Sequence, residues 1–500
     1  MKKARFLPRG AVGALTAAVF ASGMAASVAL AAPKGTLNYA TQIQNNNWNP
    51  LVKSGETHTG IPYEGLLRVA PDGFTLQPYL AKAWELTPTE LNLTLQSGVV
   101  FHDGTPFNAA AVKANLEWIR DSGTQWAATL ATVSEIVVKD DTHVTLKLSR
   151  PTPTMAARLA TRGLLMVSPK ALETKDWTKA VGTGAWVYDL AASQPGTKEV
   201  FRLFDKYWAL DKVGVESIVM HTIQDPNVAL NALRTGLVQV TEMAASLNAA
   251  AKAAGYQIET TPTLTQHFLF LDRKNMFVDM NVRKAFCTAV DLQAVSIGSF
   301  EGTMIPVSQR FPSGQSGHNP DVTGYKYDPE AAKKYLAAAG NPKISLTLPM
   351  YPGIQTTMTL VAQMLRQVGI DANTQSMTTG QYFTFYQSDR YPLQINTSAT
   401  ESIGPLDYYQ FRFSPTGVGN PFKVPVPELD AIAERALAES DPAKQEAVWK
   451  EMTKYIHDNT LDCNFYLQPT HWAFDPKKMD KLPTTTMRPS ALRYDEVVVK

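Results

Sequence analysis

The sequence predicts an α/β protein built from two lobes that are joined by two hinge strands. Segments with strand and helix periodicity alternate along the chain, which is typical of mixed α/β architecture rather than of separate all-α and all-β halves. Without the first 31 residues, 469 of the 500 residues remain, which is too many for one core and indicates two or three domains. Two extended apolar runs, at 263–271 and 463–474, bracket a helix-rich block of domain size. We therefore expect an inserted domain, a hinge and a cleft between two lobes.

The first 31 residues have the pattern of a cleaved secretory signal. A basic start, MKKARF, precedes an apolar run rich in Ala, Gly and Ser, which ends at the small-x-small site Ala29-Leu30-Ala31. A permanent membrane anchor is the alternative, because the run is nearly long enough to span a bilayer. The composition and the cleavage site favour export, with the cut after Ala31. No cysteine follows to carry a lipid anchor, so we expect a mature protein that is freely soluble in a periplasm.

The charge balance gives no indication of a polyanionic partner. The chain has 47 Lys and Arg against 45 Asp and Glu, and four of the basic residues belong to the signal, which contains no acidic residue. The mature chain therefore has a formal net charge of −2, and nucleic-acid binding is not expected.

The segment GVVFHDGTPFNAAAVKANLEW (98–118) sets His102 beside Asp103. Asp103-Gly104 is a turn signal, and Asn108 is a good N-cap for the helical pattern that follows. Adjacent side chains in an extended chain point in different directions, so the pair is a poor catalytic relay. We interpret the segment as the end of a strand, a turn and a capped helix.

Other elements follow from periodicity. Alternating apolar and polar residues predict half-buried strands at Leu91–Gln96 and His143–Leu148. Helical periodicity, in several cases ending at a glycine suited to a left-handed cap, marks four later segments. These are 228–236, 328–340, 357–369 and 429–441.

The two cysteines, Cys287 and Cys463, leave two interpretations open. The periplasm permits a disulfide, whereas a helical pattern around Cys287 also suits a buried thiol that packs as a small hydrophobic group. No His or Cys lies at ligand spacing around either residue, and the eight histidines are scattered, so no metal site and no cofactor are expected.

Enzyme motifs are missing from the sequence. It contains no G-x-S-x-G, H-E-x-x-H, P-loop or C-x-x-C motif. The segment GTGAWV begins like a dinucleotide fingerprint, but Val187 occupies the place of the third glycine, so a tight turn before a strand is the better interpretation. We assign no catalytic residue and expect no enzyme.

Taken together, several segments resemble one known family. The segments are PYEGLLRVAPDG with LQPYLAKAWEL, GVVFHDGTPFNAAAVKANLEW, VGTGAWVYDL with FDKYWAL, FVDMNVRKAFCTAVDLQAV, and YDPEAAKKYLAAAG. In order and spacing they are similar to motifs of the cluster C solute-binding proteins (family 5). These are the extracytoplasmic receptors of peptide and nickel ABC importers. The resemblance extends from about Tyr39 to Asp480, nearly the whole mature chain.

The resemblance implies a type II periplasmic-binding fold with three domains, and it implies that the protein is the solute receptor of an importer. A solute would be enclosed between domains I and III by hinge closure and passed to permease subunits in the inner membrane, with the receptor acting as a monomer. The implied limits are 32–69, 181–266 and 472–500 for domain I, 70–180 for domain II and 267–471 for domain III.

The same resemblance suggests binding residues. In peptide-binding members a loop supplies an aspartate to the ammonium group of the ligand, and Glu401 stands at that place in SATESIGPLDYY. Dipeptide binders also use an arginine near 346–357, where this chain has no basic residue, so a free dipeptide is disfavoured. A buried carboxylate without a partner is costly. The candidate binding residues are Glu401, Tyr408 and Tyr409 in domain III, and Trp48, Glu56 and His58 in domain I.

Two other functional classes remain as alternatives. A periplasmic hydrolase on the same fold would need a nucleophile and a base, for which the sequence has no motif. A non-transport binder, acting as a chaperone or a sensor, would need the same cleft. The solute itself, whether a peptide, a modified peptide, an oligosaccharide or an opine, is left open because fold does not imply ligand.

Overall fold

The computed structural model describes most of the chain beyond the signal segment. The described ranges are 33–42, 44–45, 47–51, 58–71, 75–161, 163–351, 353–378, 381–382, 388–399, 404–415, 417, 419–439, 441–484 and 492–500. The signal segment 1–31 and the candidate binding residues Glu56 and Glu401 lie outside these ranges. Within them, every helix falls short of the length and apolarity that crossing a bilayer requires.

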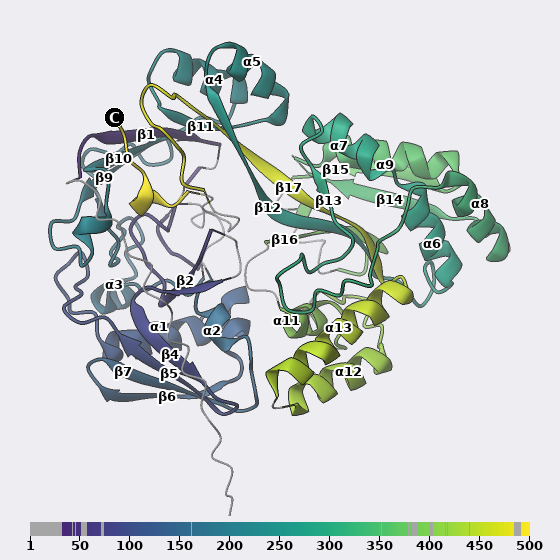
Figure 1. Ribbon diagram of the computed structural model, residues 1–500, viewed down its shortest axis with the longest axis horizontal. Coiled ribbons are helices and arrows are strands. Elements are labelled where there is room, and N and C mark those ends of the chain that lie inside the picture. Colours follow the sequence, from purple (N-terminus) through teal and green to yellow (C-terminus); the bar gives the residue numbers. More distant parts are fainter. Residues whose placement is uncertain are drawn as a thin grey trace, which may run out of the picture.

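One mixed sheet runs through both lobes and organises the molecule (Figure 1). Its strands in the described chain are β1 (Thr36–Thr41), β8 (Trp186–Tyr188), β9 (Lys198–Leu203), β10 (Ser217–Thr222), β11 (Val240–Met243), β12 (Gln257–Phe270), β13 (Ile305–Pro306), β16 (Leu393–Ala399) and β17 (Asp462–Phe474). Their order is β16-β12-β17-β11-β1-β10-β9-β8, and β13 pairs with β17 beside this path. Strand β1 is parallel to β10 and β11, whereas β17 is antiparallel to β11 and β12.

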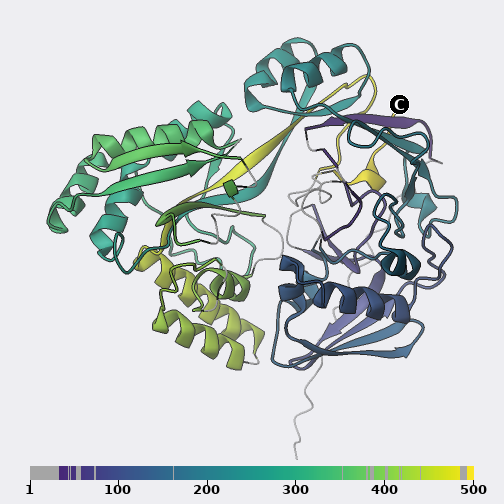
Figure 2. The same ribbon diagram turned by 180° about the vertical axis from the view of Figure 1, so that it is seen from behind.

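Strands β12 and β17 cross from one lobe to the other, as the two apolar runs predict (Figures 1 and 2). They pair antiparallel from Gln257 opposite Phe474 to Leu269 opposite Asp462. At the crossing Pro262 faces Pro469, and the register shifts directly after this pair. Proline has no backbone N–H to donate, so the ladder is weakest here, and we expect the hinge to bend at this point.

The described part of the first lobe contains two large hydrophobic cores and a smaller one that includes Leu230, Leu233 and Ala251. One large core surrounds the large sheet and includes Tyr39, Trp186 and Phe201. The other large core lies under a four-stranded antiparallel sheet of order β4-β5-β7-β6, composed of β4 (Ala81–Leu86), β5 (Glu90–Leu95), β6 (Val133–Asp140) and β7 (His143–Leu148). Around these sheets lie the hairpin β2 (Leu67–Val69) and β3 (Leu76–Pro78), and the helices α1 (Ala109–Arg120), α2 (Met155–Arg158), α3 (Pro169–Thr174), α4 (Pro226–Arg234) and α5 (Asn248–Ala253). The domain limits given above stay a prediction.

The His102–Asp103 segment is a structural turn, as expected. His102 Nε2 lies 2.8 Å from the Gly184 carbonyl oxygen, and an Asp103 carboxylate oxygen accepts the Thr105 backbone N–H at 2.9 Å. Gly104 has φ +80°, a left-handed conformation that glycine adopts without steric cost. Asn108 caps α1 by accepting the Ala111 N–H at 3.0 Å. The turn therefore fixes the smaller sheet against the larger one.

The second lobe packs helices on both faces of the β16-β12-β17 region. One layer contains α6 (Met280–Ala289), α7 (Leu292–Phe300), α8 (Pro329–Ala338) and α9 (Gln355–Gln367) with the parallel strands β14 (Ser345–Met350) and β15 (Asp371–Ser376). The other contains α11 (Pro405–Arg412), α12 (Pro427–Ala438) and α13 (Pro442–Asp458). Successive side chains of a strand point to opposite faces. Accordingly, Phe268 and Phe270 enter the first core, while Leu269 and Leu271 enter the second.

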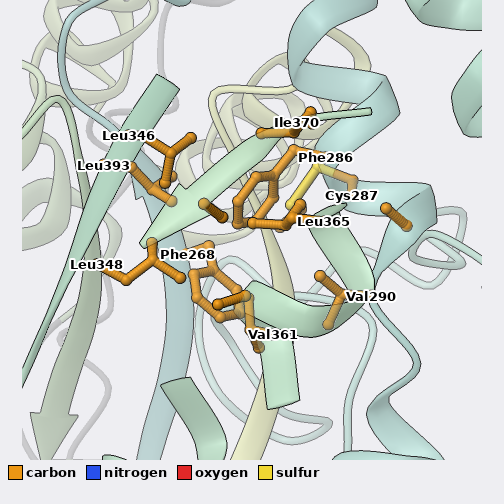
Figure 3. Close-up of a cluster of buried hydrophobic side chains, with 14 of the residues drawn as sticks. Phe268, Phe286, Cys287, Val290, Leu346, Leu348, Val361, Leu365, Ile370 and Leu393 are labelled. Atoms are coloured by element: carbon orange, nitrogen blue, oxygen red, sulfur yellow. A yellow bond between two sulfur atoms is a disulfide. The ribbon is translucent and has the colours of Figure 1, made fainter. Parts of the chain in front are cut away.

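Cys287 and Cys463 form a disulfide inside the first of these cores (Figure 3). The bond joins α6 to the start of β17 with a Cα–Cα distance of 5.9 Å. Both cysteines are almost fully buried, at 0% and 1% exposure. The structure thus decides between the two interpretations that spacing left open.

Candidate functional site

The first turn of α11 contacts the opposite lobe and so defines where the two lobes meet. Gly404 is the N-cap of this helix. A Cβ added to Gly404 would lie 2.9 Å from Thr154 Cγ2, so the chains touch without intervening space. One turn further, Asp407 forms an ion pair with Arg158 of α2. Helix α11 therefore leads from the interlobe contact into the second lobe.

Tyr408 extends from α11 into a buried polar network. Its hydroxyl donates to an Asp462 carboxylate oxygen and lies 2.8 Å from His267 Nε2. His267 belongs to β12 and stacks on Phe465 of β17, with ring centroids 4.7 Å apart. Because the tyrosine proton goes to Asp462, Nε2 of His267 is the donor in the second bond. The network fastens α11 to both hinge strands.

Three buried arginines surround this network and are referred to below as the arginine cluster: Arg273, Arg310 and Arg412. The Arg310 guanidinium lies 5.9 Å from the ring centroid of Tyr408, and that of Arg273 lies 5.5 Å from the ring of Phe413. Burial lowers the pKa of Arg273 to about 10 and that of Arg412 to about 9, and because both values lie above physiological pH these two guanidinium groups remain largely charged. This part of the second lobe therefore carries a concentration of positive charge directly behind the interlobe contact.

The arginine cluster changes the protonation of its neighbours. Burial lowers the pKa of His267 well below its usual value, and the charges of Arg310 and Arg412 lower it further. Burial raises the pKa of Asp462 to about 7, although the Tyr408 hydrogen bond and Arg273 act in the opposite direction. His267 is therefore neutral at physiological pH, and the positive potential of the cluster comes from the arginines.

A small cavity of about 10 Å³ lies against the network. It is lined by Ser308, Gln309, Arg310, Phe311, Val322, Tyr408, Thr453, Ile456, His457, Asp462 and Phe465. This volume accommodates about one water molecule. The cavity is therefore part of the packing of the second lobe and is too small for a solute.

The candidate residues of the first lobe are deeply packed. Trp48 is 3% exposed, with its ring 4.8 Å from that of Tyr188 and 5.4 Å from that of Phe201. His58 is fully buried, and its Nδ1 lies 3.4 Å from the Tyr39 hydroxyl. In this conformation both side chains belong to the core of the first lobe, so a role in binding stays a prediction.

The two tyrosines of α11 point to different places. Tyr408 is 2% exposed and turned toward the hinge strands, whereas the Tyr409 hydroxyl bonds to Asp430 of α12. The structure therefore does not bring Trp48, His58 and the two tyrosines together at one site. Glu56 and Glu401 lie outside the described residues.

The sequence offers no signal for the arginine cluster. Its members come from the end of β12, from the loop after β13 and from the last turn of α11. No common spacing or motif relates them, and arginines are rarely buried. Separately, within the described chain no group of three or more His, Cys, Asp or Glu residues is placed to hold a metal ion.

The fold defines a class of protein. Two α/β lobes joined by two long crossing strands, with one sheet continuous through both, form the type II periplasmic-binding fold. Proteins of this construction enclose a ligand by hinge closure.

Comparison with known proteins identifies the family. The model of the bacterial extracellular solute-binding proteins, family 5, matches residues 75–420, and the chain belongs to this family. A Brucella ovis protein named as an ABC transporter peptide-binding protein is 25% identical over 492 residues, which cover 89% of this chain and 90% of the relative. The glutathione-binding protein GsiB of Salmonella typhimurium is 27% identical over 421 residues, which cover 79% and 81% of the two chains.

A solved structure agrees with this assignment. NikA of Brucella suis in complex with Fe(III)-EDTA superposes with a TM-score of 0.83 at 21% identity, covering 93% of this chain and 100% of the other. The protein is therefore a bacterial extracellular solute-binding protein of family 5, with the fold of this structure. Members of the family are transport binding proteins that work in the periplasm.

Proposed function

We propose that the mature chain, cleaved after Ala31, captures a solute that carries at least one carboxylate group. A short peptide, a modified peptide or an opine has this chemistry. The protein acts as a monomer, encloses the solute between domains I and III and delivers it to the permease in the inner membrane. No cofactor and no chemical step are part of this proposal.

The arginine cluster is the observation that carries the choice of solute. Three guanidinium charges are held within the second lobe, next to the helix that meets the other lobe. A fixed positive potential in a region of low dielectric constant attracts an anionic group strongly. The named ligands of the relatives fit this chemistry, because peptides, glutathione and EDTA all carry carboxylates.

Matched pairs of ligands test the carboxylate. The mature protein is refolded to remove any bound solute, and melting is followed with tri- and tetrapeptides, glutathione and an opine, each beside its amide or ester. A ligand at about 100 times its dissociation constant adds ~2.7 kcal/mol to the free energy of unfolding. We expect the free acids to raise the melting temperature of the protein, and the amides and esters to leave it unchanged. Equal shifts for acid and amide, or a shift with neutral cello-oligosaccharides alone, would refute the proposal.

Glu401 is the proposed partner of a ligand ammonium group. A Glu401→Gln variant should bind a peptide with a free amino terminus more weakly than the wild type does, as measured by isothermal titration calorimetry. Its affinity for an N-acetylated peptide should equal that of the wild type. The remaining candidates, Trp48, Glu56, His58, Tyr408 and Tyr409, stay predictions for the same site. Should no solute bind at all, the non-transport binder on the same fold becomes the better proposal.

A further inference from the structure

The two lobes meet at an ion pair between α2 and α11. Arg158 and Asp407 are 249 positions apart in the sequence, and their side chains are only 5% and 20% exposed. Figure 1 shows α2 and α11 facing each other below the crossing strands β12 and β17, and Figure 2 shows the same arrangement from behind. The lobes are thus connected covalently by the hinge strands and non-covalently by this pair.

Each partner is built rigidly into its own lobe. Arg158 Nε donates to Thr154 Oγ1 at 3.2 Å, and Nη1 donates to the Thr129 carbonyl oxygen at 3.1 Å. Helix α2 is anchored by Met155 and Ala156 in the core under the four-stranded sheet. The guanidinium group therefore already has its orientation when the lobes separate, and little side-chain entropy is lost when they close.

Asp407 is equally well placed on the other side. It lies in the first turn of α11, where the helix dipole favours a carboxylate. Its neighbours Leu406 and Tyr408 are buried in the core formed with α12 and α13. Burial raises the pKa of Asp407, whereas the charge and hydrogen bond of Arg158 act in the opposite direction, so the arginine stabilises the charged carboxylate in the closed arrangement.

We propose that Arg158 and Asp407 form a latch that holds the lobes closed and thereby sets solute affinity without touching the solute. A receptor that binds tightly only when closed has an apparent dissociation constant equal to the intrinsic value divided by the closed fraction. The latch raises that fraction. This role of the ion pair goes beyond the proposed function, because it does not depend on which solute binds.

A designed cross-link measures the contact directly. Thr154 and Gly404 lie beside the latch, and the 2.9 Å approach of a Cβ at 404 to Thr154 Cγ2 is compatible with the Cβ–Cβ distance of about 3.8 Å in disulfides. The native cysteines are already paired. The Thr154→Cys/Gly404→Cys protein should therefore cross-link on mild oxidation, with the yield read by peptide mapping in the absence of solute. Thr154→Cys also removes the hydroxyl that accepts from Arg158 Nε, so rates are compared only within this double-cysteine background.

Variants of the latch give the decisive comparison. With Arg158→Gln in the same background, we expect cross-linking to slow about tenfold or more, the factor that loss of a charge-assisted hydrogen bond produces. Arg435→Gln is the matched control, because it removes an ion pair with Glu451 that lies within one lobe. Absence of cross-linking, or an equal rate in the Arg158→Gln protein, overturns the latch.

A second measurement covers the case in which the cysteine pair disturbs folding. Spin labels at the exposed positions Asp141→Cys and Lys444→Cys report the distance between the lobes by double electron–electron resonance. The distribution should shift to longer distances in both Arg158→Gln and Asp407→Asn, which alter the pair from opposite sides. Unchanged distributions in both variants would refute the proposal. No solute is needed, so this result is independent of the ligand test.

Discussion

Removal of the Cys287–Cys463 disulfide should destabilise the second lobe more than any single core substitution. The bond closes a loop with a sequence separation of 176 residues. In the chain-entropy treatment, a cross-link over a loop of this length stabilises the folded state by about 5 kcal/mol, because it restricts the unfolded chain. For a domain of this size, that corresponds to a loss of about 10–20 °C in melting temperature.

The assay compares three forms of the mature protein. These are the oxidised wild type, the wild type reduced with dithiothreitol, and the Cys287→Ala/Cys463→Ala variant, each unfolded in urea and followed by circular dichroism and tryptophan fluorescence. The reduced wild type keeps both side chains and loses only the cross-link, whereas the variant also leaves small voids in the core of Figure 3. We expect both to unfold at lower urea concentration, with the variant slightly below the reduced wild type.

Two results would refute this reasoning. Reduction that leaves the midpoint unchanged would mean that the cross-link does not limit the unfolded chain. A midpoint that falls only in the variant would assign the effect to packing instead of loop closure.

Two further predictions concern buried acids. Burial raises the pKa of Glu64 to about 7, so its contribution to stability is complete below its unfolded pKa and is lost as the pH rises through 7. The free energy of unfolding of Glu64→Gln, relative to that of the wild type, should therefore rise by about 3 kcal/mol as the pH increases from 4.5 to 8. Urea titrations of both proteins across this range measure the difference. A difference that does not change with pH would contradict the raised pKa of Glu64. Tyr408→Phe removes the hydroxyl that bonds Asp462 and His267, and should cost about 1–3 kcal/mol in the free energy of unfolding. An unchanged free energy of unfolding would contradict this prediction.

The hinge and most secondary structure follow from the sequence. The apolar run 463–474 corresponds to β17, Asp462–Phe474, and the run 263–271 to the second half of β12. Both segments are rich in apolar residues over the length of a strand, and such a run is a local property that one sequence displays. The same holds for the glycines after three helices, since Gly236, Gly340 and Gly369 all have positive φ.

The orientation of the α11 tyrosines was beyond such patterns. Tyr408 and Tyr409 are adjacent, and neighbours on a helix project about 100° apart, so at most one can face a given site. Only the docking of α11 on β12 and β17 decides that Tyr408 reaches His267 while Tyr409 reaches Asp430.

By itself, the sequence determined the class of fold, the two crossing strands, the structural role of the His102–Asp103 turn and the family of receptors. Only the tertiary structure decided that the two cysteines are joined, that three arginines are buried together and that Arg158 meets Asp407. These features join residues that are far apart in the chain. Periodicity and capping report the environment of a single segment, whereas a long-range pair depends on how whole segments pack, which no local pattern records.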